Sequence, residues 1–216
     1  MSEKKAMVSV VALIGDLVDS RKSPDRQALH TMLDDVLDVV NRRLDPIEPA
    51  VITVGDEFQG VYRSLGDALT ASFWIRISLS PLGDVRFGVG RGEVRTLDTT
   101  RGILDGSAFW RARDAIEVVE SRAGRARTRT SRTGFHSPDD LPHLVAAVQA
   151  TLDCLDFMVG SLSSSSHAIL EGLMNGHTQL EIAERAGISP SAVSQRLRRD
   201  GLGVALDTMT TLGSQP

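Results

Sequence analysis

The first part of the chain alternates between the hydrophobic spacing of strands and that of helices. The Val-rich run Met7–Ile14 has strand length and is uniformly apolar, which predicts a central strand buried on both faces. Between Leu29 and Leu44 apolar residues recur at intervals of three and four, which predicts one long amphipathic helix. Ser23 and Pro24 precede it as an N-cap and a helix-starting proline.

The same alternation continues beyond this helix. Val51–Val54 and Gln59–Arg63 predict the two strands of a hairpin. Ser64 is expected to cap a helix that ends at Leu79, and Asp84–Arg91 predicts a further strand. The order strand-helix-strand-strand-helix-strand is that of the ferredoxin-like fold, an α/β (α+β) architecture with an antiparallel sheet. Right-handed crossovers place its first and third strands side by side at the centre.

Two further helices and a short strand are expected before residue 160. Ser107–Glu120 and Asp140–Met158 have helical spacing, and Thr128–Thr133 has the composition of an edge strand. Cys154 stands among leucines in the second of these helices and is expected to be a core thiol. Because it is the single cysteine, no internal disulfide can form, which favours a reducing, cytoplasmic location.

The stretch Gly160–Ser166 contains five serines and is expected to link two folded units. It divides the chain into residues 1–160, which hold the ferredoxin-like domain, and residues 161–216, a small all-α domain. A length of 216 residues suits two such domains.

Thr178–Leu197 has the pattern of a helix-turn-helix and resembles the helices of sigma-factor region 4 and of LuxR-type regulators. Ala183 is small where two helices cross, Gly187 suits the tight turn, and Ser189 with Pro190 begins the second helix. The exposed polar groups of that helix are of the kinds that contact base edges and phosphates of double-stranded DNA. The candidate DNA-binding residues are Ser189, Ser191, Ser194, Gln195, Arg196, Arg198 and Arg199. A helix pair used for protein contact or dimerisation is the alternative.

Composition limits the function without identifying it. With 28 acidic and 24 basic residues the formal charge is −4, which excludes a uniformly basic nucleic-acid coat but not a small DNA-reading module. Seven arginines lie in Arg111–Arg132 and indicate contact with phosphate or nucleic acid, or a solvated face. The sequence has no uninterrupted run of about 18 apolar residues, so no membrane partner is expected.

Three acidic residues are expected to meet at one edge of the sheet. Asp16 follows the first predicted strand, and Asp56 and Glu57 occupy the tip of the hairpin beside it. Converging carboxylates repel unless a cation neutralises them, and their hard oxygen atoms suit Mg²⁺ or Mn²⁺. Because Mg²⁺ takes its other ligands from water and phosphates, a ligand carrying a triphosphate is predicted. An ordinary Gly-Asp turn at each position is the alternative.

Several segments resemble the palm domain of class III nucleotide cyclases and diguanylate cyclases. Gly55-Asp56-Glu57-Phe58 is similar to the diguanylate-cyclase signature, although the doubled glycine is missing. Arg86–Val94 and Asp105–Arg113 resemble the segment after the second helix and the following helix start. More closely, the stretch Gly15–Glu117 resembles the SatD family of small bacterial proteins.

The resemblance implies a metal bound by Asp16 and Asp56, with the carbonyl oxygen of Leu17 as a further ligand. Where cyclases place a transition-state asparagine and arginine, this chain has Trp110 and Asp114, which cannot perform that role. Candidate nucleotide-binding residues are Arg21, Glu57, Arg91, Arg111 and Arg113.

These features favour a DNA-binding transcriptional regulator. Its palm domain is expected to sense a phosphorylated nucleotide with a divalent metal and to alter the geometry of a homodimer, hence the spacing of the two DNA-reading helices. The alternative is an active metal-dependent nucleotidyl cyclase or nucleotidyl transferase with an accessory helix-turn-helix. A non-catalytic scaffold is the third interpretation.

Overall fold

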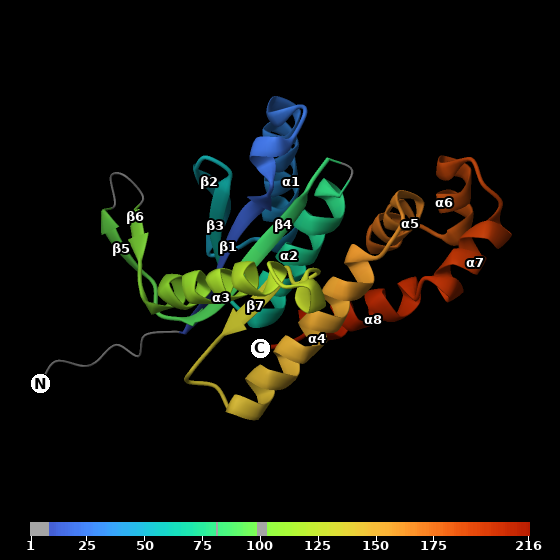
Figure 1. Cartoon of the computed structure of the whole chain (residues 1–216). Helices are drawn as coiled ribbons and strands as arrows, with labels where there is room; N and C mark the ends of the chain where they lie inside the picture. Colours follow the sequence, from blue (N-terminus) through green and yellow to red (C-terminus); the bar gives the residue numbers. More distant parts are fainter. Residues whose placement is uncertain (1–8, 81, 99–102) are drawn as a thin grey trace, which may run out of the picture.

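The computed structural model describes residues 9–80, 82–98 and 103–216. A five-stranded sheet with the order β2-β3-β1-β4-β7 forms its centre, and a two-stranded hairpin stands at one side (Figure 1). The strands are β1 Val10–Val18, β2 Glu48–Val54, β3 Glu57–Tyr62, β4 Asp84–Gly92, β5 Arg95–Asp98, β6 Ile103–Asp105 and β7 Thr133–His136. The helices are α1 Arg26–Leu44, α2 Leu65–Leu79, α3 Ser107–Ala123, α4 Pro142–Gly160, α5 Ser164–Met174, α6 Gln179–Ala186, α7 Pro190–Arg199 and α8 Leu202–Gly213, with short 3-10 helices η1 Ser20–Lys22 and η2 Ala126–Thr128.

The predicted order from β1 to β4 is confirmed. β1 lies at the centre of the sheet and runs antiparallel to β3 on one side and to β4 on the other. The protein is therefore an α/β fold in which these elements have the ferredoxin-like arrangement.

The four strands of this order are antiparallel, as predicted, and a fifth strand makes the sheet mixed. β7 joins the edge of the sheet parallel to β4. It begins at Thr133, whereas the predicted strand Thr128–Thr133 ends there, because the preceding residues turn through η2. Parallel strands need a long crossover connection, and α3 supplies it.

β1 continues further than its apolar run predicts. It reaches Val18, so Asp16 lies within the strand and not after its end. Residues 7 and 8 of the predicted strand lie outside the described residues. Pairing with β3 stops at Asp16, whereas pairing with β4 continues to Val18.

The capping residues were predicted correctly for α2 but not for α1. Ser64 accepts a hydrogen bond from the Asp67 backbone N–H (3.0 Å), as expected. α1 begins at Arg26 and is capped by Asp25, while Ser23 closes the short helix η1. The helical spacing therefore located α1 well, but the local turn after β1 shifted its first residue.

Both faces of β1 are covered, as its uniformly apolar sequence predicts. Leu13 faces a core formed with α1 and α2, and Ile14 faces a second core formed with α3. α3 lies very close to β4, because a Cβ atom at Gly88 would stand 2.0 Å from the Ala112 carbonyl oxygen. Small residues at this contact bring the side chains of α3 near the sheet.

The C-terminal helices follow α4 after a short connection and not after a long flexible linker. Gly160 is the last residue of α4 and Ser163 caps α5, so only residues 161–163 connect the two helices. α8 packs along α2, and Met209 and Leu212 join the same hydrophobic core as Leu69. The division at residue 160 thus separates two segments that share one core.

α6 and α7 have the predicted boundaries and caps. Thr178 and Glu181 form a capping box, and Gly187 adopts the left-handed conformation (φ 63°) in the three-residue turn. Ser189 caps α7 and Pro190 is its first residue. The pair therefore has the local features expected of a helix-turn-helix.

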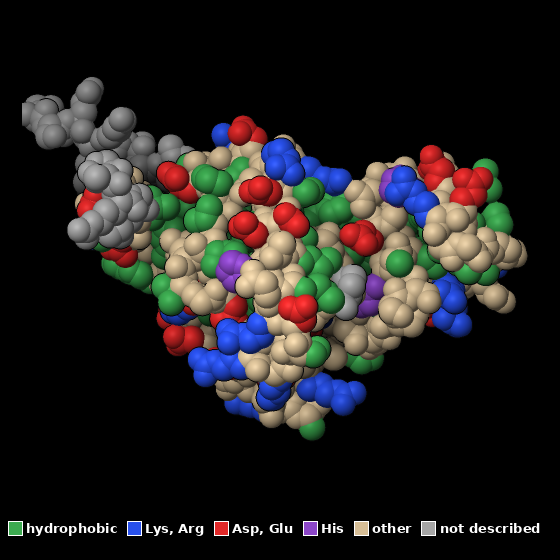
Figure 2. Space-filling model, turned by 90° about the horizontal axis from the view of Figure 1, so that it is seen from above, with side chains coloured by type: hydrophobic (Ala, Val, Ile, Leu, Met, Phe, Trp, Pro, Cys, Tyr) green, Lys and Arg blue, Asp and Glu red, His purple; other side chains and the backbone are tan. Residues whose placement is uncertain are grey.

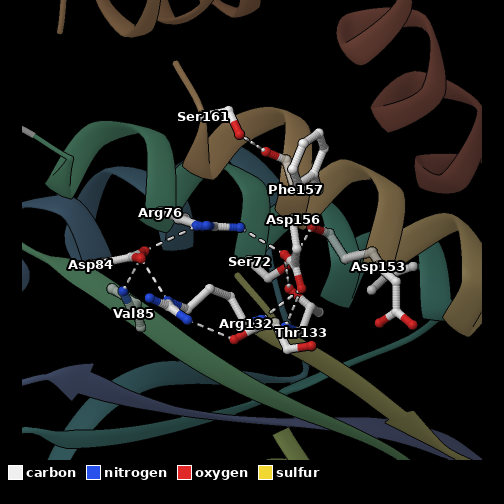
Figure 3. A network of polar contacts seen from close by, with 12 residues as sticks. Ser72, Arg76, Asp84, Val85, Arg132, Thr133, Asp153, Asp156, Phe157 and Ser161 are labelled. Atoms are coloured by element: carbon white, nitrogen blue, oxygen red, sulfur yellow. Dashed lines mark hydrogen bonds and ion pairs between the residues drawn. The ribbon is translucent and has the colours of Figure 1, made fainter. Parts of the chain in front are cut away.

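A buried ionic network joins α2, α4, β4 and the residues at the start of β7 (Figure 3). Arg76 binds Asp84 (3.0 Å) and Asp156 (2.6 Å), and Arg132 binds Asp84 (2.6 Å). Asp156 also accepts hydrogen bonds from the backbone N–H groups of Arg132 and Thr133. Burial raises the pKa of Asp84, but Arg76 and Arg132 outweigh that effect and hold it below its usual value.

We expect Asp156→Ala to lower the free energy of unfolding by about 3–5 kcal/mol, because it leaves the buried Arg76 without its closest partner. Asp153→Ala is the control. Asp153 lies about one turn earlier on α4, and its substitution removes the partly exposed pair with Arg122. This loss should lower the free energy of unfolding by no more than about 1 kcal/mol. Urea unfolding of both variants measures the difference, and equal losses would contradict the assignment.

Candidate functional site

The register of three strands brings Asp16, Glu57 and Arg86 together. Asp16 lies opposite Glu57 on β3 and opposite Arg86 on β4, so all three side chains stand on the face covered by α3. Arg86 binds Asp16 (2.9 Å) and reaches Glu120 of α3 (2.6 Å). The ionic contacts therefore connect the centre of the sheet to the helix above it.

A second arginine reaches the same place from α3. The two terminal nitrogens of Arg113 donate to the two carboxylate oxygens of Glu57, both at 2.6 Å. Together these groups surround a cleft of about 260 Å³. It is lined by Asp16, Glu57, Arg86, Arg113, Ile116, Glu117 and Glu120. Four carboxylates against two guanidiniums give the cleft a formal charge of −2.

Acidic side chains are also grouped on one face of the molecule. Seen from the side on which the turn between β2 and β3 lies in Figure 1, they gather near the middle, and most basic side chains lie toward the lower edge (Figure 2).

Asp56 acts on this cleft from the turn between β2 and β3. Burial raises the pKa of Asp16 above its usual value, Arg86 lowers it, and the negative charge of Asp56 raises it. Asp56 is half-buried and is not among the side chains that line the cleft. The charge of Asp56 therefore acts on Asp16 from outside the cleft lining, and joint binding of a cation by the two aspartates stays a prediction.

The predicted metal ligands can offer a cation two carboxylates. Among the described residues, no group of three or more His, Cys, Asp or Glu side chains is arranged to hold a metal ion. Mg²⁺ needs only one or two carboxylates when water or phosphate completes its shell, so Asp16 and Asp56 fit it. The side chain of Leu17 belongs to the core. A cation at Asp16 would compete with Arg86 for the carboxylate.

The candidate nucleotide-binding residues are divided between both ends of the sheet. Glu57 and Arg113 lie in the cleft and bind each other, and Arg21 is exposed on η1. Arg91 pairs with Val11, five positions from Asp16 along β1, which is about 17 Å at strand spacing.

The remote arginines have other partners. Arg91 binds Asp140 (3.3 Å), and Arg111 binds Asp139 (2.8 Å) and the Arg91 carbonyl oxygen (2.6 Å). Arg91 and Arg111 therefore contact residues that do not line the cleft around Asp16.

Sequence reasoning missed Arg86, which binds Asp16, and Glu120, which binds Arg86. Arg86 alternates with Val85 and Phe87 in a strand covered on both faces, and a charged residue at such a position requires a partner. That signal was present, but the partner could be identified only from the register.

Trp110 and Asp114, which the resemblance to cyclases suggested for the transition-state positions, lie outside the cleft lining. Trp110 is 57% exposed, and its indole N–H donates to Asp105 (2.8 Å). Asp114 lies 3.5 Å from a ring nitrogen of His136.

The candidate DNA-binding residues share one helix. Along α7 and its cap, Ser194 and Arg196 are half-buried and the others are exposed, namely Ser189, Ser191, Gln195, Arg198 and Arg199. Asp200 binds Arg199 (2.6 Å) and accepts a hydrogen bond from the Ser166 hydroxyl of α5 (2.6 Å). Hydrogen bonds from Arg199 and Ser166 lower the pKa of Asp200 to about 2. The end of α7 is thereby fixed to α5.

Comparisons with known proteins give one family and several distant structures, two of which are described. The sequence model of the SatD family matches residues 10–213. The chain is similar to the non-canonical dimeric guanylyl cyclase domain of the RhoGC fusion protein from the aquatic fungus Blastocladiella emersonii, with 15% identity, 53% of this chain and 74% of that chain covered, and a TM-score of 0.40. It is also similar to a monomeric double mutant of that domain, with 18% identity, 50% of this chain and 72% of that chain covered, and a TM-score of 0.35. No curated protein sequence matched the chain.

We expect Arg86→Gln to raise the pKa of Asp16 further, because the guanidinium favours the charged carboxylate. Lys22→Gln is the control, because it removes a cation that binds Asp19 (2.9 Å) and not Asp16. Carboxyl carbon NMR across a pH titration measures both, and an unchanged or lower Asp16 pKa in Arg86→Gln would contradict the assignment.

Proposed function

The chain belongs to the SatD family, and we propose that it is a DNA-binding regulator that senses a divalent cation with a phosphorylated nucleotide. The observation that carries this proposal is the free polar face of α7. Gln195 and Arg198 are exposed and have no hydrogen-bond or ion-pair partner among the described residues. Amide and guanidinium groups on a helix are suited to reading base edges in the major groove.

Local structure supports the same use of α7. The cap at Ser189 and the link from Asp200 to Ser166 hold both ends of the helix. Such support lowers the cost of ordering the contacting side chains on binding. The negative charges of Glu181 and Glu184 on α6 offset the positive charges of the arginines on α7, so the attraction to DNA is expected to be modest.

We expect the protein to prefer its own promoter DNA over random DNA, with affinity falling as salt rises. Gln195→Ala and Arg198→Ala should each weaken the specific complex by about 1–3 kcal/mol. Arg42→Ala, on the exposed side of α1, should leave it unchanged. Fluorescence anisotropy at two salt concentrations measures these affinities, and wild-type protein without a salt-sensitive preference would refute DNA reading.

The carboxylate cleft supports the sensing part of the proposal. Its formal charge of −2, with Asp56 adding a further negative charge nearby, favours a cation. A divalent ion there would supply the positive charge that lets phosphate oxygens approach this acidic surface. Asp16 and Asp56 would hold the ion, and Arg113 would have to exchange Glu57 for phosphate.

We expect Mn²⁺ to bind in calorimetry and Asp56→Asn to weaken its affinity about tenfold or more. Arg86→Gln should tighten it, because the competing guanidinium is removed from Asp16. Asp38→Asn, exposed on α1, is the control. Identical affinities in all four proteins would refute the site. Mass spectrometry of the same samples with nucleoside triphosphates distinguishes sensing from catalysis, because only an enzyme would form a cyclic product.

A further inference from the structure

The outer face of α4 is apolar and uncovered. In Figure 1 this helix lies along the outside of the molecule, and its first half projects beyond β7. No residue from 142 to 151 is buried. Leu141 just before the helix, and Leu144 and Phe157 within it, are 57%, 53% and 62% exposed.

Both acidic side chains of α4 form ion pairs on the inner side of the helix. Asp153 binds Arg122 (2.5 Å) of α3, and Asp156 binds Arg76 of α2. The exposed positions of α4 therefore carry no acidic, Lys or Arg side chain, and His143 is their one basic group. A surface helix ordinarily presents charged or polar residues to solvent, so an apolar outer face indicates a contact surface.

The spacing on this face indicates what kind of partner it fits. His143, Ala147, Ala150, Cys154 and Phe157 are all exposed and follow intervals of four, three, four and three. That is the heptad spacing with which one helix packs against another over several turns. α4 has 19 residues and is about 28 Å long, enough for such a seam.

We infer that two copies of this chain associate through α4, with the two helices antiparallel about a two-fold axis at Ala150. In this arrangement each Ala150 faces its counterpart, Phe157 faces His143, and Ala147 lies within one residue, about 1.5 Å along the axis, of the level of Cys154. Small residues lie at the centre, where the helices are closest, and the large Phe157 lies at each end. An uncharged face matches a second uncharged face, and a two-fold interface needs such self-complementarity. The inference names the interface of the expected homodimer and does not depend on DNA or nucleotide binding.

Disulfide formation tests this pairing in the full chain. Ala147→Cys, with Cys154 retained, should give a covalent dimer on mild oxidation, because residues 147 and 154 of opposite chains lie within one residue of the same level. Ala150→Cys combined with Cys154→Ser should also cross-link. Wild-type protein and Val118→Cys with Cys154→Ser, an exposed position on α3, should not. Rapid cross-linking of wild-type Cys154 would indicate parallel helices and overturn the arrangement.

Sedimentation equilibrium tests the surface without cysteine chemistry. Ala150→Glu and Phe157→Glu should each weaken dimerisation at least about tenfold, whereas Val118→Glu should not. Their unchanged far-ultraviolet circular dichroism would show that the fold is intact. A wild-type monomer at micromolar concentration would refute the proposal.

A membrane is the other outcome that the measurements separate. Of the described helices, α4 alone has the length and apolar composition of a membrane span, and 22% of its apolar window is buried. Wild-type protein that stays monomeric and floats with phosphatidylglycerol-containing vesicles, unless Phe157→Glu is present, would replace self-association with membrane contact.

Discussion

Burial of β1 on both faces and along both edges is the constraint from which the candidate site arises. From Val10 to Gly15 every residue of the strand is buried, so a charge is tolerated only where the coverage ends, at Asp16. The neighbouring strands place Glu57 and Arg86 on the same face there. A slip of one residue would turn these side chains to the opposite face, where the core with α1 and α2 lies. The cleft is thus a consequence of how the central strand leaves the core.

The inner side of α4 packs and forms ion pairs, whereas its outer side is exposed and apolar. Its inner side supplies Leu152 and Leu155 to the core and two carboxylates to arginines of α2 and α3. Asp156 is buried and requires its arginine partner, and the partly exposed Asp153 also binds inward. The polar groups that would ordinarily make a surface helix soluble are therefore absent from the outside.

Periodicity in the sequence predicted the strands and helices up to β4 and the caps of α2 and α7, because those signals are local. It predicted an edge strand at Thr128–Thr133 but neither the bounds of β7 nor its parallel pairing, because β7 is four residues long and depends on pairing with β4. Topology alone predicted that Asp16 and Asp56 converge, whereas the distance of Arg91 from Asp16 depends on the register of β4 against β1. Cys154, expected in the core among leucines, is exposed, since helical neighbours in sequence point in different directions.

The three-residue connection between α4 and α5 is one of two attachments that orient α7. Residues 161–163 are too few to act as a tether, and Ser163 and Ser166 fix the start of α5 to the end of α7 through Asp200. α7 also packs against α8, which packs along α2, so α5, α6 and α7 are attached to the first part of the chain through both α4 and α2. The direction in which the exposed polar face of α7 points is therefore set by two core helices together.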